Sequence, residues 1–276
     1  MNKSVITKQK VSLVLLLFSF SICKNNAQNS SKDLFNQLYS INLSDKKSDR
    51  FAEIAKFFIN KPYVAGTLEG PTSETLVVNL HQFDCTTLVE TSLALALCKP
   101  NDFDDFKKKL TQIRYRNGEI VNYASRLHYL TDWLQTNQTN GILELETKKM
   151  GGILFKNSPN FMSTHWPLYP RANSDLIKSG IIVAEKELAK QTFYFIPKSN
   201  IPSIESKIKE GDIIAITTSI AGLDCSHQGI AVWKEGNLHL LHASSSHKKV
   251  IISALPLKAY INQIKSHSGI MIGRIL

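Results

Sequence analysis

The residue with the clearest chemical potential is Cys85, which follows an aspartate. Residues 88–97 contain no Gly or Pro and predict a helix, for which Asp84 is a suitable N-cap residue. In the first turn of a helix, the dipole and the free backbone N–H groups stabilise a thiolate, so we expect a lowered pKa for Cys85. A lone cysteine at a helix start is more often a small packed side chain, so its role depends on what the fold brings to it.

Two histidines flank a predicted β-hairpin turn at residues 234–237. The register is set by pairing the residues on either side of this turn. Because side chains alternate along a strand, His227 and His242 then lie on one face as diagonal neighbours, roughly 7–8 Å apart. Gly229 is directly opposite His242 in this register, and we expect it to leave open space between the two rings.

A thiol and two imidazoles on one face would suffice for nucleophilic catalysis. If the helix start packs against this face, His227 takes the proton of Cys85 and returns it to a leaving group, while His242 orients His227. The N–H groups at the helix start would hold an oxyanion. Two other arrangements remain open: a zinc site that adds Cys225 to these residues, and a disulfide between Cys98 and Cys225. The zinc alternative lacks the closely paired ligands of structural sites.

The elements that must position these residues change character along the chain. Helical spacing of apolar residues appears at 50–60, at 103–115 and along the stripe Tyr123, Leu127, Leu130 and Leu134. Short strands are predicted at 180–183 and 193–197. Further strands are predicted at 212–217, 228–233, 238–243, 249–253 and 269–275. A helical front half followed by an antiparallel sheet defines the α+β class.

The first 27 residues have the features of a secretory signal peptide. Lysines at positions 3, 8 and 10 precede a short apolar run, 11–23, and Ala27 is a suitable cleavage position. The run is too short to span a bilayer, so we predict a periplasmic protein with no stable membrane insertion after cleavage. Lipoprotein anchoring at Cys23 is the weaker alternative, because the bulky Ile22 precedes it.

Charge and cysteine content narrow the class of protein. Removing residues 1–27 takes away four lysines and no acid, so the net charge falls from +10 to +6, with 29 basic and 23 acidic residues. These charges are scattered, and nucleic acid is therefore not expected as a partner. Cys85, Cys98 and Cys225 remain after cleavage, an odd number that leaves at least one free thiol.

The order of several motifs resembles the NlpC-type cell-wall cysteine hydrolases. The matching positions are Tyr63, Asp84-Cys85, 211–214, 226–232 and 241–243. The resemblance implies a papain-like core in which the helix-borne Cys85 packs on the C-terminal antiparallel sheet. It also implies that His227 is the base, that His242 is the third polar residue, and that Tyr63 lies near the oxyanion. No cofactor is implied.

Two departures point to one branch of that family. Thr86-Thr87 replaces the Ser-Gly of compact members, and a large insert separates Cys85 from His227. Both features, with Arg114-Tyr115 and 123–129, are similar to the larger N-acetylmuramoyl-L-alanine amidase-like branch. This implies cleavage of the amide between the muramic acid lactyl group and L-alanine in muropeptides. A γ-D-glutamyl–diamino acid endopeptidase, a thiol acyltransferase and a non-catalytic peptidoglycan-binding protein are the alternatives.

The predicted organisation separates a catalytic core from an insert. A polar lead-in (28–50) precedes the helical part of the core (51–98), the substrate-specificity insert (99–204) and the sheet of the core (205–276). The candidate substrate-binding residues are Asp84, Ser226, Arg126, His128, Tyr129 and Trp133. If the stretch after Tyr123 is helical, Arg126, Tyr129 and Trp133 share one face, where Arg126 would bind a carboxylate. The competing interpretation makes the two aromatic residues core and Arg126 an ion-pair partner.

Overall fold

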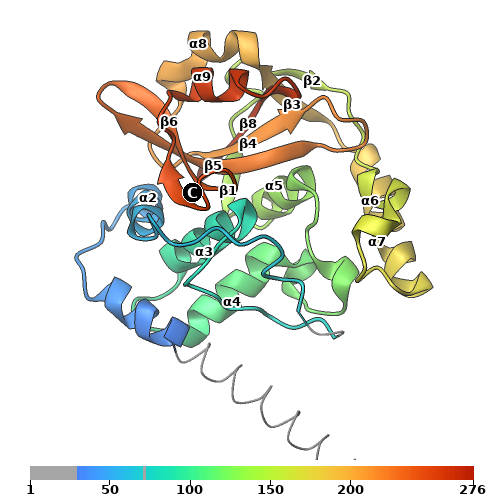
Figure 1. The fold of residues 1–276 in the computed structure, drawn as a ribbon, viewed down its shortest axis with the longest axis horizontal. Helices are drawn as coiled ribbons and strands as arrows, with labels where there is room; N and C mark the ends of the chain where they lie inside the picture. The colour runs from blue at the N-terminus through green and yellow to red at the C-terminus, as the bar shows by residue number, and fades with distance from the viewer. Residues whose placement is uncertain (1–29, 71–72) are drawn as a thin grey trace, which may run out of the picture.

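The computed structural model describes residues 30–70 and 73–276, so the predicted signal peptide and Cys23 lie outside the described residues. The chain is a mixed α+β protein built on an eight-stranded antiparallel sheet, which confirms the predicted class (Figure 1). The strands are β1 (Leu143–Leu145), β2 (Ile153–Phe155), β3 (Phe193–Pro197), β4 (Ile213–Thr218), β5 (Cys225–Lys234), β6 (Asn237–Ser244), β7 (Lys249–Ile252) and β8 (His267–Ile275). Their order is β2-β3-β8-β4-β5-β6-β7, with β1 paired to β8.

Helices lie on both faces of this sheet and to one side of it (Figure 1). They are α2 (Lys47–Phe57), α3 (Cys85–Leu97), α4 (Phe103–Arg114), α5 (Leu130–Thr139), α6 (Phe161–Thr164), α7 (Asp175–Ala189), α8 (Ile201–Ile204) and α9 (Leu257–Asn262). Short 3₁₀ turns are η1 (Arg116–Gly118), η2 (Tyr123–Ser125), η3 (Trp166–Leu168), η4 (Lys198–Asn200) and η5 (Glu205–Lys207). The strands β4 to β8 begin and end within three residues of the limits predicted for the C-terminal strands.

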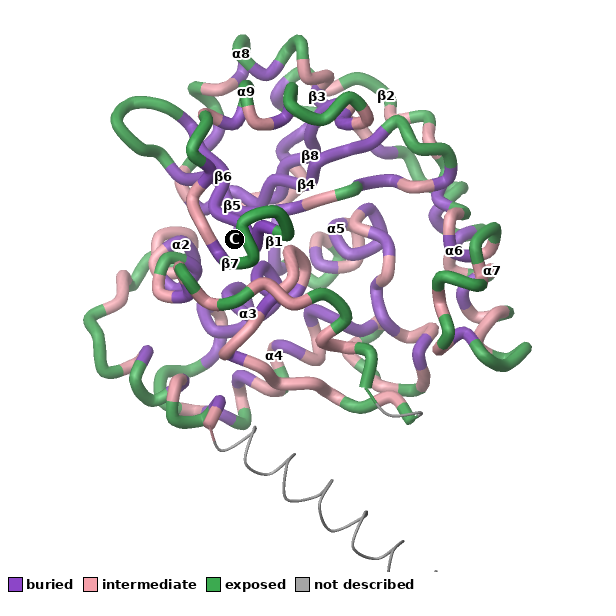
Figure 2. The backbone as a smooth tube through the Cα atoms, in the orientation of Figure 1, coloured by how far each residue is buried: buried purple, intermediate pink, exposed green. Residues whose placement is uncertain are grey.

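The alternation of apolar residues along β5 and β6 builds a separate core on each face. Ile230 and Leu241 pack with α2 and α3, whereas Ala231 and Leu240 pack with α8 and α9. The middle of β5 and nearly all of β6 are buried, as the purple tube in Figure 2 shows. Burial on both faces fixes the register, since a slip by one residue would exchange the two cores.

Three local expectations are wrong. Residues 28–50 are more than a polar lead-in, because residues 30–39 form a helix whose Phe35 and Leu38 are fully buried. Residues 180–183 are part of the long helix α7 and not a strand. The stripe that begins at Tyr123 is not one helix, because the chain is extended at Arg126 and α5 starts only at Leu130.

Within the described ranges, no helix has both the length and the apolar character needed to cross a membrane.

Candidate active site

Cys85 is the first residue of α3, as predicted. Asp84 caps the helix, because its carboxylate accepts the N–H of Thr87 at 2.8 Å while the Thr87 hydroxyl accepts the N–H of Asp84 at 2.9 Å. This reciprocal capping box satisfies two backbone donors and fixes where the helix begins. Cys85 is half-buried, which leaves its thiol within reach of a ligand.

The two histidines meet directly. The predicted hairpin register is confirmed from Ile230–Leu241 to Lys234–Asn237, and Nε2 of His227 lies 2.8 Å from Nδ1 of His242. Their rings are nearly perpendicular, with centroids 4.9 Å apart. The expected open space at Gly229 is wrong, since a Cβ there would lie 2.6 Å from the carbonyl oxygen of Leu241. Gly229 instead permits a close approach of backbone.

Cys85 and His227 line one cavity of about 150 Å³. Its walls come from the start of α3, from the segment that leads into α5, from α6 with the following turn, and from the start of β5. The lining residues are Cys85, Thr86, His128, Tyr129, Leu130, Met162, Tyr169, Leu223, Asp224, Cys225, Ser226 and His227. His242 is absent from this lining and lies behind His227.

The carboxylate of Asp224 forms hydrogen bonds with residues of two of these walls. The N–H and the hydroxyl of Thr131, in the first turn of α5, donate to its Oδ2 at 2.7 and 2.8 Å. The N–H of Cys225 donates to Oδ1 at 2.7 Å. A carboxylate from the β5 side thus caps a helix that is more than ninety residues away in sequence, and it holds Tyr129 and His227 at the same cavity.

The thiol of Cys85 is neutral in this environment. Burial, followed by the neighbouring carboxylate of Asp84, raises its pKa to about 11, against a smaller lowering effect of the Gln228 backbone. We expected the helix start to lower this pKa, and the direction is the opposite. The N-cap carboxylate explains part of the difference, because it places negative charge beside the sulfur and engages a backbone donor of the first turn.

Both imidazoles are neutral as well. Burial lowers the pKa of His227 to about 3, and His242 and His267 add to the effect. Burial also lowers the pKa of His242 to about 4. A neutral imidazole that shares a cavity with a neutral thiol suits general-base catalysis, in which the proton moves as the sulfur attacks.

Two tyrosines lie near the thiol. Tyr63 forms a parallel bridge with Phe83, and its pKa is raised by burial, then by Cys85 and Asp84. Tyr260, on α9, was not predicted. Burial and then the charge of Cys85 raise its pKa to about 12, and its ring lies against both histidines. No local sequence pattern around Tyr260 distinguishes it.

Apart from Asp84, which caps α3, the candidate substrate ligands fall into two groups. His128, Tyr129 and Ser226 line the cavity, and the Nε2–H of His128 donates to the Tyr123 carbonyl at 2.8 Å. Trp133 is fully buried, and the Arg126 guanidinium contacts protein carboxylates. The sequence left open whether these residues bind substrate or support the fold. Trp133 lies in the core and Arg126 forms ion pairs, as the second interpretation describes.

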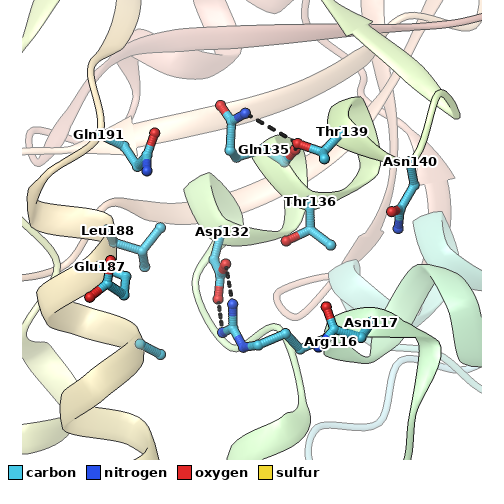
Figure 3. A pocket seen from close by; sticks show the side chains of 11 residues that line it. Arg116, Asn117, Asp132, Gln135, Thr136, Thr139, Asn140, Glu187, Leu188 and Gln191 are labelled. Atoms are coloured by element: carbon cyan, nitrogen blue, oxygen red, sulfur yellow. Dashed lines mark hydrogen bonds and ion pairs between the residues drawn. The ribbon is translucent and has the colours of Figure 1, made fainter.

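A larger hollow of about 270 Å³ lies between α5 and α7 (Figure 3). Its floor carries the ion pair between Arg116 and Asp132, whose atoms approach to 2.5 Å, and Glu187 pairs with Lys190. The rest of its lining is mostly amide and hydroxyl side chains, together with Ala184 and Leu188. The charged groups of this hollow are paired, and the hollow lacks a nucleophile. The cavity at Cys85 is therefore the better candidate for chemistry.

The structure contains neither the disulfide nor the zinc site considered as alternatives for the cysteines within its described residues. All three described cysteines are free thiols, so Cys98 and Cys225 form no disulfide. The described residues include no group of three or more His, Cys, Asp or Glu arranged to hold a metal ion. The Cys98 sulfur instead lies 3.0 Å from the Tyr39 hydroxyl.

The raised pKa predicts the alkylation behaviour of Cys85. Because only the thiolate reacts, we expect the rate with iodoacetamide to rise about tenfold per pH unit from pH 7 to about 10, with no plateau below that. Mass spectrometry of the modified peptide measures the rate, and Cys85→Ala gives the background from the buried thiols. A plateau below pH 8 would instead show a preformed thiolate–imidazolium pair.

These observations define a class: a mixed α+β protein in which a helix-borne thiol shares a cavity with a histidine that is paired to a second histidine on an antiparallel sheet. The family follows from the sequence. Residues 53–270 match the model of the AmiA-like family, described as N-acetylmuramoyl-L-alanine amidase-like. This match covers well over half of the chain, so the protein belongs to the AmiA-like family.

Solved structures agree with this assignment. An N-acetylmuramoyl-L-alanine amidase from Bacteroides uniformis is 38% identical, with a TM-score of 0.81, over 83% of this chain and 99% of that one. A Bacteroides fragilis protein, provisionally named a xylanase, is 41% identical, with a TM-score of 0.78, over 81% and 100%. A Legionella pneumophila protein at 24% identity shares the fold, with a TM-score of 0.69 over 93% and 96%. No functionally curated protein matches the chain.

Proposed function

We propose that the protein is an exported cysteine amidase that cleaves the N-acetylmuramoyl-L-alanine bond of peptidoglycan fragments. The observation that carries this proposal is the placement of Cys85 and His227 in one cavity, with His242 hydrogen-bonded behind His227. Membership of the AmiA-like family and the Bacteroides uniformis neighbour support the choice of bond. The core would then be papain-like, in agreement with the resemblance of its motifs to NlpC-type enzymes.

Acylation would begin with the neutral thiol of Cys85 and the neutral imidazole of His227. The sulfur of Cys85 attacks the lactyl carbonyl carbon while its proton moves to Nδ1 of His227, because Nε2 is engaged with His242. The backbone N–H of Cys85 and the hydroxyl of Tyr63 stabilise the negative oxygen of the tetrahedral intermediate. His227 then gives the proton to the departing nitrogen of L-alanine, and the lactyl group remains as a thioester on Cys85.

Deacylation repeats these steps with water. His227 removes a proton from the water that attacks the thioester carbonyl, and the proton returns to the sulfur as the carbon–sulfur bond breaks. The free lactyl carboxyl group is the product. An amine in place of water would give transfer instead of hydrolysis, so product masses separate an amidase from an acyltransferase.

The xylanase name of one neighbour implies a different chemistry, which the cavity does not favour. Glycoside hydrolysis generally uses two carboxyl groups that flank the sugar bond. Within the cavity lining of the described chain, Asp224 is the only carboxyl residue, and both of its oxygens already accept hydrogen bonds from Thr131 and Cys225. The thiol and the imidazole are the groups that remain free to react.

Mass spectrometry of a defined muropeptide digest tests the proposal. We expect loss of the whole stem peptide, sensitivity to a thiol alkylator and no effect of a chelator. A cut after the glutamate would indicate the γ-D-glutamyl–diamino acid endopeptidase. Binding without turnover over long incubation would indicate a non-catalytic peptidoglycan-binding protein.

A further inference from the structure

Tyr260 places an aromatic ring against the histidine pair from α9. Its centroid lies 5.1 Å from that of His242 at an interplanar angle of 63°, and 6.4 Å from that of His227 at 40°. We propose that the ring of Tyr260 is a positioning group that accepts the Nε2–H of His242 and thereby keeps Nδ1 of His227 free to act as the base. This proposal rests on the proposed function of the histidine pair.

The argument begins with the single proton shared by the two rings. Each neutral imidazole carries one N–H, and Nε2 of His227 faces Nδ1 of His242 at 2.8 Å. If the proton is on Nε2 of His227, its Nδ1 has a free lone pair that can take the thiol proton. If the proton is on Nδ1 of His242, His227 carries its own proton on Nδ1 and cannot act as a base toward Cys85.

The choice between these two states depends on Nε2 of His242. This nitrogen is buried and has no hydrogen-bond partner among the described residues. In the productive state it is an N–H donor, and in the unproductive state it is a lone-pair acceptor. The face of an aromatic ring carries negative charge, so it attracts an N–H and repels a lone pair. Tyr260 is the ring in T-shaped contact with His242.

The neighbouring groups do not replace this contact. Burial, with smaller contributions from His267 and His247, disfavours positive charge on the pair and keeps both rings neutral near pH 7. The nearby thiol of Cys85 is neutral as well. The ring of Tyr260 is therefore the feature that distinguishes the two neutral states, and its hydroxyl is not needed for this effect.

Two variants test the proposal. Tyr260→Leu removes the aromatic face, whereas Tyr260→Phe keeps it. We expect kcat to fall about tenfold in Tyr260→Leu with KM unchanged, and to stay within about twofold in Tyr260→Phe. Nitrogen-15 NMR at pH 7 should show His242 protonated on Nε2 in the wild type and in Tyr260→Phe, and a mixture of the two states in Tyr260→Leu.

The remaining outcomes overturn the proposal. Equal losses in both variants would assign the role to the hydroxyl, and full activity in Tyr260→Leu would remove any role. A wild-type protein with His242 protonated on Nδ1 would contradict the proton assignment itself. The NMR result does not depend on turnover, so a failure of the proposed amidase function is distinguishable from a failure of this proposal.

Discussion

Cys85→Ala is expected to lower kcat by about 10⁴-fold or more and to leave the fold intact. The sulfur is the only group in the proposed mechanism that forms a covalent bond with the substrate, and nucleophile deletions in comparable enzymes cost at least this much. The substitution keeps the capping box of Asp84 and Thr87, because neither bond involves the Cys85 side chain. The measurement is muropeptide turnover by mass spectrometry, with circular dichroism to monitor the fold.

A second buried thiol provides the matched control. Cys98 ends the same helix, and its partners are the Tyr39 hydroxyl and the Leu95 carbonyl, far from the histidine pair in the chain. Cys98→Ala should therefore keep wild-type turnover. Full activity in Cys85→Ala would reject thiol catalysis. Equal losses in both variants would mean that the cysteines act through stability, so that Cys85 is not the nucleophile.

The histidine pair was predictable because its determinants are local. A short turn with Gly236-Asn237 and strict alternation of side chains fix the hairpin register, and the register alone places His227 and His242 on one face. The start of α3 was predictable for the same reason, since the cap at Asp84 lies next to Cys85. Sequence spacing therefore contained the two local parts of the proposed site, whereas the shared cavity of Cys85 and His227 depends on the tertiary fold.

The missed features depend on contacts between distant segments. Residues 180–183 have the β-branched composition of a strand, yet they lie within α7, where Gly180 packs so closely on Ala124 that a Cβ would lie 2.8 Å from it. The pKa of Cys85 depends on burial by cavity walls that come from four parts of the chain. Tyr260 reaches the histidines from a separate short helix, so neither spacing nor composition distinguishes it.

Arg126→Ala is expected to lower the free energy of unfolding by about 3 kcal/mol, the low end for breaking a buried ion pair, because it leaves the buried Glu74 carboxylate with Arg171 as its remaining cationic partner. The Arg126 side chain is only 6% exposed, and that of its partner Glu74 is fully buried. The guanidinium donates to Glu74 at 2.6 Å, to Glu69 at 2.9 Å and to the Leu68 carbonyl at 2.6 Å. Arg171 also pairs with Glu74, at 2.9 Å. Urea unfolding followed by fluorescence measures the loss.

The same variant separates the two roles that the sequence left open for Arg126. If it pairs with the protein, folded Arg126→Ala should keep KM within about twofold, and Glu74→Gln should also destabilise the protein because it removes the partner charge. Glu187→Gln, which breaks the exposed pair with Lys190, should change stability by less than about 1 kcal/mol. A tenfold rise in KM with unchanged stability would instead make Arg126 a ligand for the substrate carboxylate. Four of the five guanidinium N–H groups already donate to Glu74, Glu69 and the Leu68 carbonyl, so a substrate carboxylate could bind in a bidentate way only by displacing one of these partners. We therefore expect the loss of stability.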